Sequence, residues 1–205
     1  MSFEESFCAC EEEALRFLVA EHGFRRLGRE INRRGADAGG VHARVVYRAS
    51  EVDPESEREV VLDVAPLRLE LGLQIASTAA GAFAIEELHA LDGREPFPQR
   101  MHGLYDAMFE PEQLLAEFDR LGGVLRACGR RFFNDEPSLW DDLLQQRERR
   151  AESERVRDVL ARAKDAFYAR DWLQVVALLA PIESRLGRRA SARLVYARRK
   201  ALARE

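Results

Sequence analysis

Residues 67–75 constrain the fold most, because large aliphatic side chains alternate strictly with Arg, Glu, Gly and Gln along them. Successive side chains of a β-strand point to opposite faces of a sheet, so this alternation predicts a strand with one apolar face. A strand whose other face is polar suits an antiparallel sheet that packs helices on one side and meets solvent on the other. The sequence therefore predicts an α+β fold.

Further strands flank this segment. Residues 41–47 and 59–65 show the same alternation, and residues 24–31 predict a first, irregular strand. Turn-rich segments containing Gly or Pro separate these runs, as they do between consecutive antiparallel strands. We therefore predict an antiparallel meander of three or four strands.

Helices are predicted before and after the meander. Apolar residues recur at helical spacing over residues 4–22, 84–91, 104–108, 111–125 and 137–144. The first helix should turn Val19 toward the core and the acidic residues 11–13 outward. In the long helix after Pro111, Gly122 and Gly123 cost about 1 kcal/mol each relative to Ala, so either another backbone comes close or the helix bends.

Charge divides the chain into two parts. Residues 1–150 hold 29 Asp and Glu against 19 Arg, whereas residues 151–205 hold 13 Lys and Arg against 7 acids. The nearly all-polar stretch 145–155, where the last helix of the first part should end, is taken as the boundary. We predict an α+β domain over 1–150 and a helical extension over 151–205. The extension should pack on the domain, because its large apolar side chains are too numerous to leave in water. These side chains are Phe167, Trp172, Val176 and Leu179.

Part of the extension resembles a tetratricopeptide unit, a helical hairpin that builds protein-interaction scaffolds. Ala163 and Phe167 match the small and aromatic positions of the first helix of such a unit. Asp171 and Trp172 match its turn, and Arg170 stands where Gly is usual. The resemblance implies a hairpin that contacts other proteins.

The first domain is similar in layout to small bacterial proteins of uncharacterised families, among them immunity proteins that neutralise polymorphic toxins. The shared layout is a leading helix ending in Gly23-Phe24, an antiparallel meander and then helices. The resemblance implies no particular functional residue. It implies a non-enzymatic protein-binding module of the immunity or adaptor kind, with a protein partner still to be identified.

Several classes of chemistry are disfavoured. Cys8 and Cys10 lie two residues apart on a predicted helix, so they point in different directions and cannot share a metal ion. Their acidic neighbours should also raise the pKa of these thiols. The four histidines have no ligand spacing, and no phosphate-binding, dinucleotide-binding or serine-hydrolase motif occurs. We predict no catalytic residue, no metal and no cofactor.

The hydropathy and the first residues of the chain predict a cytoplasmic protein. No apolar run approaches the roughly 18 residues that a membrane span requires. The first residues are acidic, where a signal peptide would be basic. We therefore expect no membrane association.

Three groups of polar residues are candidate binding sites. The first is an acidic connection between two predicted strands, which consists of Glu51, Asp53, Glu55 and Glu57. The second is the basic tail, with Arg188, Arg189, Arg198 and Arg199. Tyr196 is the only aromatic residue among these cations, which disfavours nucleic acid as their partner. The third is the segment 94–109, which would serve the alternative function of a small enzyme through Arg94, Arg100, His102 and Tyr105.

Overall fold

The computed structural model describes residues 3–34, 40–49, 57–65, 70–94, 97 and 111–203. The chain divides into two compact units, Met1–Gln146 and Arg147–Glu205, and each is described by itself. The division falls inside helix α7 (Ser138–Tyr168). The expectation that this helix ends near residue 145 is therefore wrong. Arg, Glu and Gln are good helix formers, so the polar stretch lacks an apolar stripe without losing its helical backbone.

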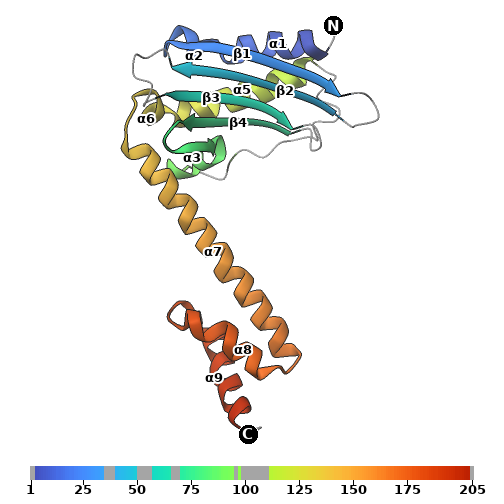
Figure 1. Cartoon of the computed structure of the whole chain (residues 1–205), viewed down its shortest axis with the longest axis vertical. Coiled ribbons are helices and arrows are strands. Elements are labelled where there is room, and N and C mark those ends of the chain that lie inside the picture. Colours follow the sequence, from blue (N-terminus) through green and yellow to red (C-terminus); the bar gives the residue numbers. More distant parts are fainter. Residues whose placement is uncertain are drawn as a thin grey trace. The chain divides into compact units, whose positions relative to one another are not determined.

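A five-stranded antiparallel sheet forms the centre of the first unit, with the strands in the order β1-β2-β3-β4-β5 (Figure 1). The strands are β1 (Phe24–Arg34), β2 (Gly40–Ala49), β3 (Arg58–Ala65), β4 (Glu70–Ser77) and β5 (Gly81–Ala84). The predicted α+β class is confirmed. The predicted number of strands is too low, because β5 is short and contains one large apolar residue, Phe83.

Residues 70–75 of the alternating segment belong to β4, in which Leu71, Leu73 and Ile75 are buried as predicted. Leu67 and Leu69 lie outside the described residues. The strand register places Val45 of β2 beside Leu62 of β3, and Leu62 beside Leu73 of β4. These aligned apolar side chains form the middle of the inner face of the sheet.

Helices cover the inner face, whereas no helix of the described residues lies on the other face, which we call the uncovered face (Figure 1). They are α1 (Phe3–Ala14), α2 (Arg16–Ala20), α3 (Ile85–Leu91), α5 (Pro111–Cys128), α6 (Arg130–Phe133) and the start of α7. Phe7 of α1 and Phe118 of α5 meet edge to face, with 5.2 Å between ring centroids. The helix predicted over 104–108 lies outside the described residues.

The first predicted helix is two helices, because the backbone leaves helical geometry at Leu15. The break turns Phe17 into the core and leaves the side chain of Val19 about half exposed, so the predicted inward position of Val19 is wrong. Gly23, with a φ of 69°, ends this segment and leads the chain into β1. A left-handed φ of this kind carries no steric cost for glycine.

Gly122 marks a close approach of two backbones. A Cβ atom at this position would lie 3.2 Å from the carbonyl oxygen of Ala14, whereas one at Gly123 would have no neighbour within 4 Å. Of the two reasons predicted for glycine in this helix, close approach of another backbone therefore holds at Gly122. The absent side chain lets α5 pack tightly on the end of α1.

The second unit has a core of its own. It comprises the C-terminal part of α7, α8 (Trp172–Leu179), the 3-10 helix η3 (Ala180–Arg185) and α9 (Arg188–Leu202). Its buried residues are Ala163, Ala166, Trp172, Val175, Leu179, Leu194 and Ala197. Phe167 and Val176 pack against them, so the side chains expected to dock on the first domain are used inside this unit. Docking of the extension stays a prediction, now without that apolar argument.

The turn between α7 and α8 contains a residue with a left-handed backbone. Arg170, at the position where Gly is usual, has a φ of 59°. Asp171 then caps α8, because its side chain accepts a hydrogen bond from the backbone N–H of Gln174 at 3.1 Å. Among all the described residues, no helix is both long enough and apolar enough to span a membrane.

Candidate functional site

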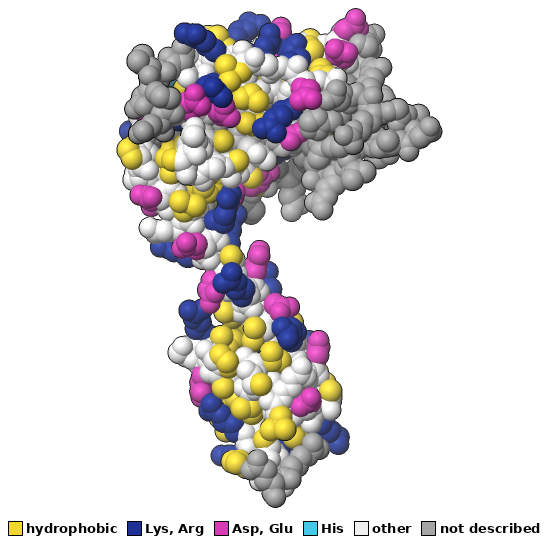
Figure 2. Space-filling view, in the orientation of Figure 1, with side chains coloured by type: hydrophobic (Ala, Val, Ile, Leu, Met, Phe, Trp, Pro, Cys, Tyr) yellow, Lys and Arg dark blue, Asp and Glu magenta, His cyan; other side chains and the backbone are white. Residues whose placement is uncertain are grey.

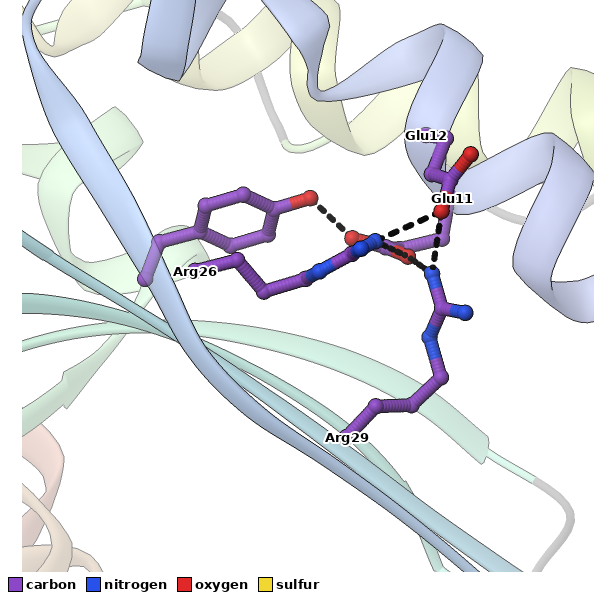
Figure 3. A network of polar contacts seen from close by, with 5 residues as sticks. Glu11, Glu12, Arg26 and Arg29 are labelled. Atoms are coloured by element: carbon purple, nitrogen blue, oxygen red, sulfur yellow. Dashed lines mark hydrogen bonds and ion pairs between the residues drawn. The ribbon is translucent and has the colours of Figure 1, made fainter.

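A buried carboxylate on α1 is the centre of the most extensive polar network described in the first unit. Glu11 is fully buried, so the expectation that residues 11–13 all point outward is wrong for it. Its side chain accepts hydrogen bonds from the Tyr47 hydroxyl and from Arg29, and Arg26 lies 3.5 Å away (Figure 3). The network joins α1 to β1 and β2.

The sequence did carry a signal for the position of Glu11. It lies four residues after Phe7 and three before Ala14, both of which are buried. This is the spacing of one helix face, so the acid occupies a place on the apolar stripe of α1. Residue type alone places Glu11 in solvent, whereas its position in the helical period places it on the buried face.

A β-bulge brings the two arginines of the network to the same face of the sheet. Arg26 pairs with Tyr47 and Arg29 with Val45, while Leu27 is the extra residue between Arg26 and Gly28. In a regular strand, residues three apart point to opposite faces. The bulge adds one residue, so Arg26 and Arg29 both point inward toward α1.

The charges of the network balance. Glu12 accepts hydrogen bonds from Arg26 at 2.7 Å and from Arg29 at 3.0 Å, so two carboxylates face two guanidinium groups. These hydrogen bonds lower the pKa of Glu12. Burial and the hydrogen bond to Glu11 raise the pKa of Tyr47 well above its ordinary value, so its hydroxyl remains a donor at neutral pH. The arrangement suits a structural lock between helix and sheet.

Two hollows lie on either side of β1. One, of about 390 Å³, is lined by Glu12, Arg16, Val19, Arg26 and Tyr47 beside the network. The other, of about 370 Å³, lies on the uncovered face around Leu27, Gly28 and Val46, with Arg44 and Arg48 among its walls.

The uncovered face of the sheet carries an apolar row between two charged rows. The register aligns Gly28, Val46 and Val61 across β1, β2 and β3, and the extra residue Leu27 lies at the β1 end of this row. Val61 is buried and Val46 is half-buried, so Leu27 is the exposed large apolar side chain of the row. One flanking row contains Arg25, Arg48 and Glu59, and the other contains Glu30, Arg44 and Asp63. Figure 2 shows hydrophobic side chains gathered on this face with basic and acidic groups beside them.

The acidic connection predicted as a binding site lies partly within the described residues. Glu57 pairs with Arg48 at 3.2 Å, and Arg48 also pairs with Glu59 at 2.7 Å. The other predicted members, Glu51, Asp53 and Glu55, lie outside the described residues. Glu57 therefore belongs to the rim of the uncovered sheet face.

Of the segment proposed for the alternative enzyme site, Arg94 alone among the named residues is described. It pairs with Asp92 and donates a hydrogen bond to the backbone carbonyl of Ala127 at 3.0 Å. These contacts tie the end of α3 to the end of α5. The remaining residues, Arg100, His102 and Tyr105, lie outside the described part of the chain.

The predicted basic residues of the tail lie on α9. Arg188, Arg189 and Arg199 are exposed. Arg198 forms a two-pronged ion pair with Glu183, at 2.9 and 2.7 Å. The tail is therefore an ordered helix, in which Arg198 holds η3 against α9.

The remaining reactive side chains have structural surroundings. Burial is the main reason that the pKa values of the Cys8 and Cys10 thiols are raised, which disfavours the reactive thiolate. His22 stacks on Phe133 with ring centroids 3.7 Å apart. No three His, Cys, Asp or Glu side chains within the described residues are arranged to hold a metal ion.

Comparison of the chain with protein-family models, with curated proteins and with solved structures found no match. Two surfaces of the described residues remain as candidate binding sites, the uncovered sheet face and the basic face of α9.

Proposed function

We propose that the protein is a non-enzymatic protein-binding module that binds its partner through the uncovered face of the sheet. The observation that carries this proposal is Leu27, a large apolar side chain that is 52% exposed at the bulge of β1. It lies at the end of an apolar row that has charged residues on both sides. Protein interfaces commonly combine an apolar centre with a polar rim of this kind.

The hollow beside Leu27 supports the same role. Its lining combines apolar Val46 with Arg44 and with the acidic residues Glu30 and Glu59. Arg48, which also lines it, is already paired with Glu57 and Glu59. A partner side chain that fills such a depression is the usual anchor of an interface, and Arg44 at its edge can bind a partner carboxylate. The partner should therefore present an apolar residue next to an acidic one.

The buried network supports a preorganised surface. Glu11 and Tyr47 hold α1, β1 and β2 together directly behind the proposed contact surface. A surface that is already ordered loses less conformational entropy when it binds. The sheet face would then bind without rearrangement.

The finer description as an immunity protein or an adaptor rests on the resemblance in layout. An immunity protein should bind a toxin encoded by an adjacent gene and abolish its activity. An adaptor should bind two proteins without inhibiting either. The small-enzyme alternative rests on residues outside the described part of the chain, and no observation favours it.

Substitution Leu27→Asp tests the proposed surface. The partner is captured by crosslinking in the native host, identified and purified, and its Kd is measured by calorimetry. Loss of an interface anchor commonly costs 2 kcal/mol or more, so we expect Leu27→Asp to weaken binding by a factor of about 30. Leu173→Asp is the matched control, because Leu173 is 71% exposed in the second unit.

The melting temperature of each variant separates loss of binding from loss of folding. Equal affinity of Leu27→Asp and the unchanged chain would reject the sheet face as the binding surface. Weaker binding by Leu173→Asp alone would assign protein binding to the helical unit instead.

A further inference from the structure

Four residues of α9 form a stripe on one face of that helix. Arg189, Arg193, Tyr196 and Lys200 are spaced by four, three and four residues. Residues at these spacings lie above one another along an α-helix, about 6 Å apart for each step of four. The described part of α9 holds six Lys and Arg residues and no carboxylate. The neighbouring Glu183 pairs with Arg198, which lies off the stripe.

The fold places further aromatic rings beside this stripe. The ring centroids of Phe167 and Trp172 lie 5.7 and 5.4 Å from that of Tyr196. The guanidinium of Arg193 lies 5.7 Å from the centre of the Phe167 ring. The ammonium of Lys200 lies at the same distance from the Tyr196 ring. Tyr196 is thus one of three clustered rings, although it is the only aromatic residue among the basic residues in sequence.

Exposure decides which groups are available to a ligand. The side chains of Arg189, Lys200 and Tyr196 are exposed, and that of Arg193 is half-buried. Trp172 is buried and Phe167 is partly buried, so these two rings support Tyr196 from beneath. The accessible surface therefore combines the exposed part of the Tyr196 ring with three cations along the helix.

We propose that this stripe, Arg189-Arg193-Tyr196-Lys200, binds single-stranded nucleic acid. The cations would contact successive phosphates, and an unpaired base would stack on Tyr196. Single-strand binding sites combine basic grooves with aromatic rings because every base offers a π-face. An acidic protein segment would use the cations and leave the ring without a role, so the aromatic cluster favours nucleic acid. This proposal is independent of the sheet face.

The test uses the full chain and fluorescence anisotropy. The probes are labelled single-stranded DNA and RNA of mixed sequence, about 12 nucleotides long, within the range of known site sizes. We expect a Kd between about 10⁻⁶ and 10⁻⁴ M, typical of binding without sequence specificity. Three cations in contact with phosphates predict a slope of about −2 when the logarithm of the association constant is plotted against the logarithm of the salt concentration. The affinity should then fall about 20-fold between about 50 and 200 mM salt.

Two matched double variants locate the cations. Arg193→Gln with Lys200→Gln should reduce the slope to about −0.7, because one phosphate contact would remain. Arg188→Gln with Arg199→Gln makes the same change in net charge on the same helix but off the stripe. This control should keep a slope near −2. Equal losses in the two double variants would overturn the proposal, since they would indicate general attraction to a basic helix.

Substitutions at Tyr196 test stacking. Loss of one base–aromatic stack costs about 1 to 3 kcal/mol, so Tyr196→Ala should weaken binding by a factor of about 5 to 150, whereas Tyr196→Phe should bind like the unchanged chain. If Tyr196→Ala does not fold, Tyr196→Phe and the double variants still decide. No anisotropy change at low salt would overturn the proposal. So would tighter binding of an oligoglutamate peptide, which would identify an acidic protein surface as the ligand.

Discussion

At the scale of single residues, Glu11 is an acid in a position where the helical period calls for an apolar side chain. Burial of a carboxylate is costly unless charged and hydrogen-bonding partners surround it. Tyr47 and Arg29 supply those partners, and Arg26 adds a third, more distant one. The network therefore specifies how α1 sits on the sheet as well as holding it there.

Substitution Glu11→Gln removes the buried carboxylate charge. The side chain of Arg29 is only 22% exposed, so its positive charge would then have a weaker partner in a poorly solvated position. We expect the free energy of unfolding of the first unit to fall by about 3 kcal/mol, the lower end for breaking a buried pair. Urea titration measures this through Trp140 fluorescence in a Trp172→Phe background. The control Glu13→Gln changes an exposed acid of the same helix and should cost less than about 0.5 kcal/mol. Equal costs for the two substitutions would contradict a role for the network in stability.

Tyr47 should make the first unit sensitive to alkaline pH. Its pKa is raised in the folded protein by burial and by the hydrogen bond to Glu11, whereas in the unfolded chain it has the ordinary value of about 10. Above pH 10 the unfolded chain loses this proton and the folded one keeps it, so stability falls by about 1.4 kcal/mol per pH unit. Below pH 10 both states are protonated, and this contribution is fully present.

The comparison with Tyr47→Phe isolates this effect from other titrating groups. The free energy of unfolding of the unchanged chain minus that of Tyr47→Phe should be about 1.4 kcal/mol smaller at pH 11 than at pH 7. Denaturant titrations of both proteins at the two pH values measure it. If this difference in the free energy of unfolding does not change with pH, the hydroxyl of Tyr47 ionises normally in the folded state.

At the scale of elements, two irregularities set the packing of regular structure. The β-bulge at Leu27 rotates Arg26 and Arg29 onto one face of the sheet, and Gly122 lets α5 approach the end of α1. In a regular strand, Arg26 and Arg29 would lie on opposite faces. A larger residue at position 122 would keep α5 away from α1.

The adjacent glycines of α5 should respond to alanine with opposite signs. Gly123→Ala meets no neighbour, so the gain in helix propensity should raise the free energy of unfolding by about 1 kcal/mol. Gly122→Ala brings a Cβ atom to 3.2 Å from a backbone oxygen that can move only with α1. We expect Gly122→Ala to lower the free energy of unfolding by about 1 kcal/mol, because the cost of overpacking outweighs the gain in helix propensity. Denaturant unfolding measures both, and stabilisation by both substitutions would show that α1 shifts freely.

The turn between α7 and α8 holds a strained arginine. Arg170 has a left-handed φ of 59°, which costs a non-glycine residue about 1 to 2 kcal/mol. Arg170→Gly should therefore stabilise the second unit by about 1 kcal/mol. Denaturant titration followed by Trp172 fluorescence in a Trp140→Phe background measures it. The neighbouring control Ala169→Gly has no positive φ to relieve and should destabilise the unit, so stabilisation by both would point to a different cause.

At the scale of the whole molecule, the two units have separate cores. The larger core uses residues up to Leu143, and the smaller one begins at Ala163 with Leu160 packed against it. The apolar side chains of the extension are thus buried without help from the first unit. Opposite net charge remains as the reason to expect docking.

Truncation after Arg150 tests this docking. Exposed charge pairs are worth about 0 to 1 kcal/mol each, so the fragment 1–150 should melt about 2 to 4 °C below the first unit of the full chain at low salt. Because such pairs are screened, the difference should shrink at about 0.5 M salt. Calorimetry of the fragment and the full chain measures both temperatures. Equal melting at both salt concentrations would show that the units are independent.

Several elements of the fold could be predicted from the sequence, because the evidence for them is local. The alternation in β4, the strand patterns of β2 and β3 and the apolar stripe of α5 appear in the structure because each is a repeat of two or of about 3.6 residues. The same local evidence required a special reason for glycine in α5 and a sharp turn near Arg170. It also assigned the binding candidates that lie on exposed, charged segments of the chain.

The features that join residues distant in the sequence could not be predicted, because they depend on how the elements pack in three dimensions. Glu11 and Tyr47 are 36 positions apart, and the bulge that aligns Arg26 with Arg29 is visible only in the register with β2. The rings beside Tyr196 come from α7 and α8 rather than from α9. Side-chain periodicity describes which face a residue occupies, whereas the identity of the group opposite is set by how elements pack. Both proposed binding surfaces of this protein depend on that packing.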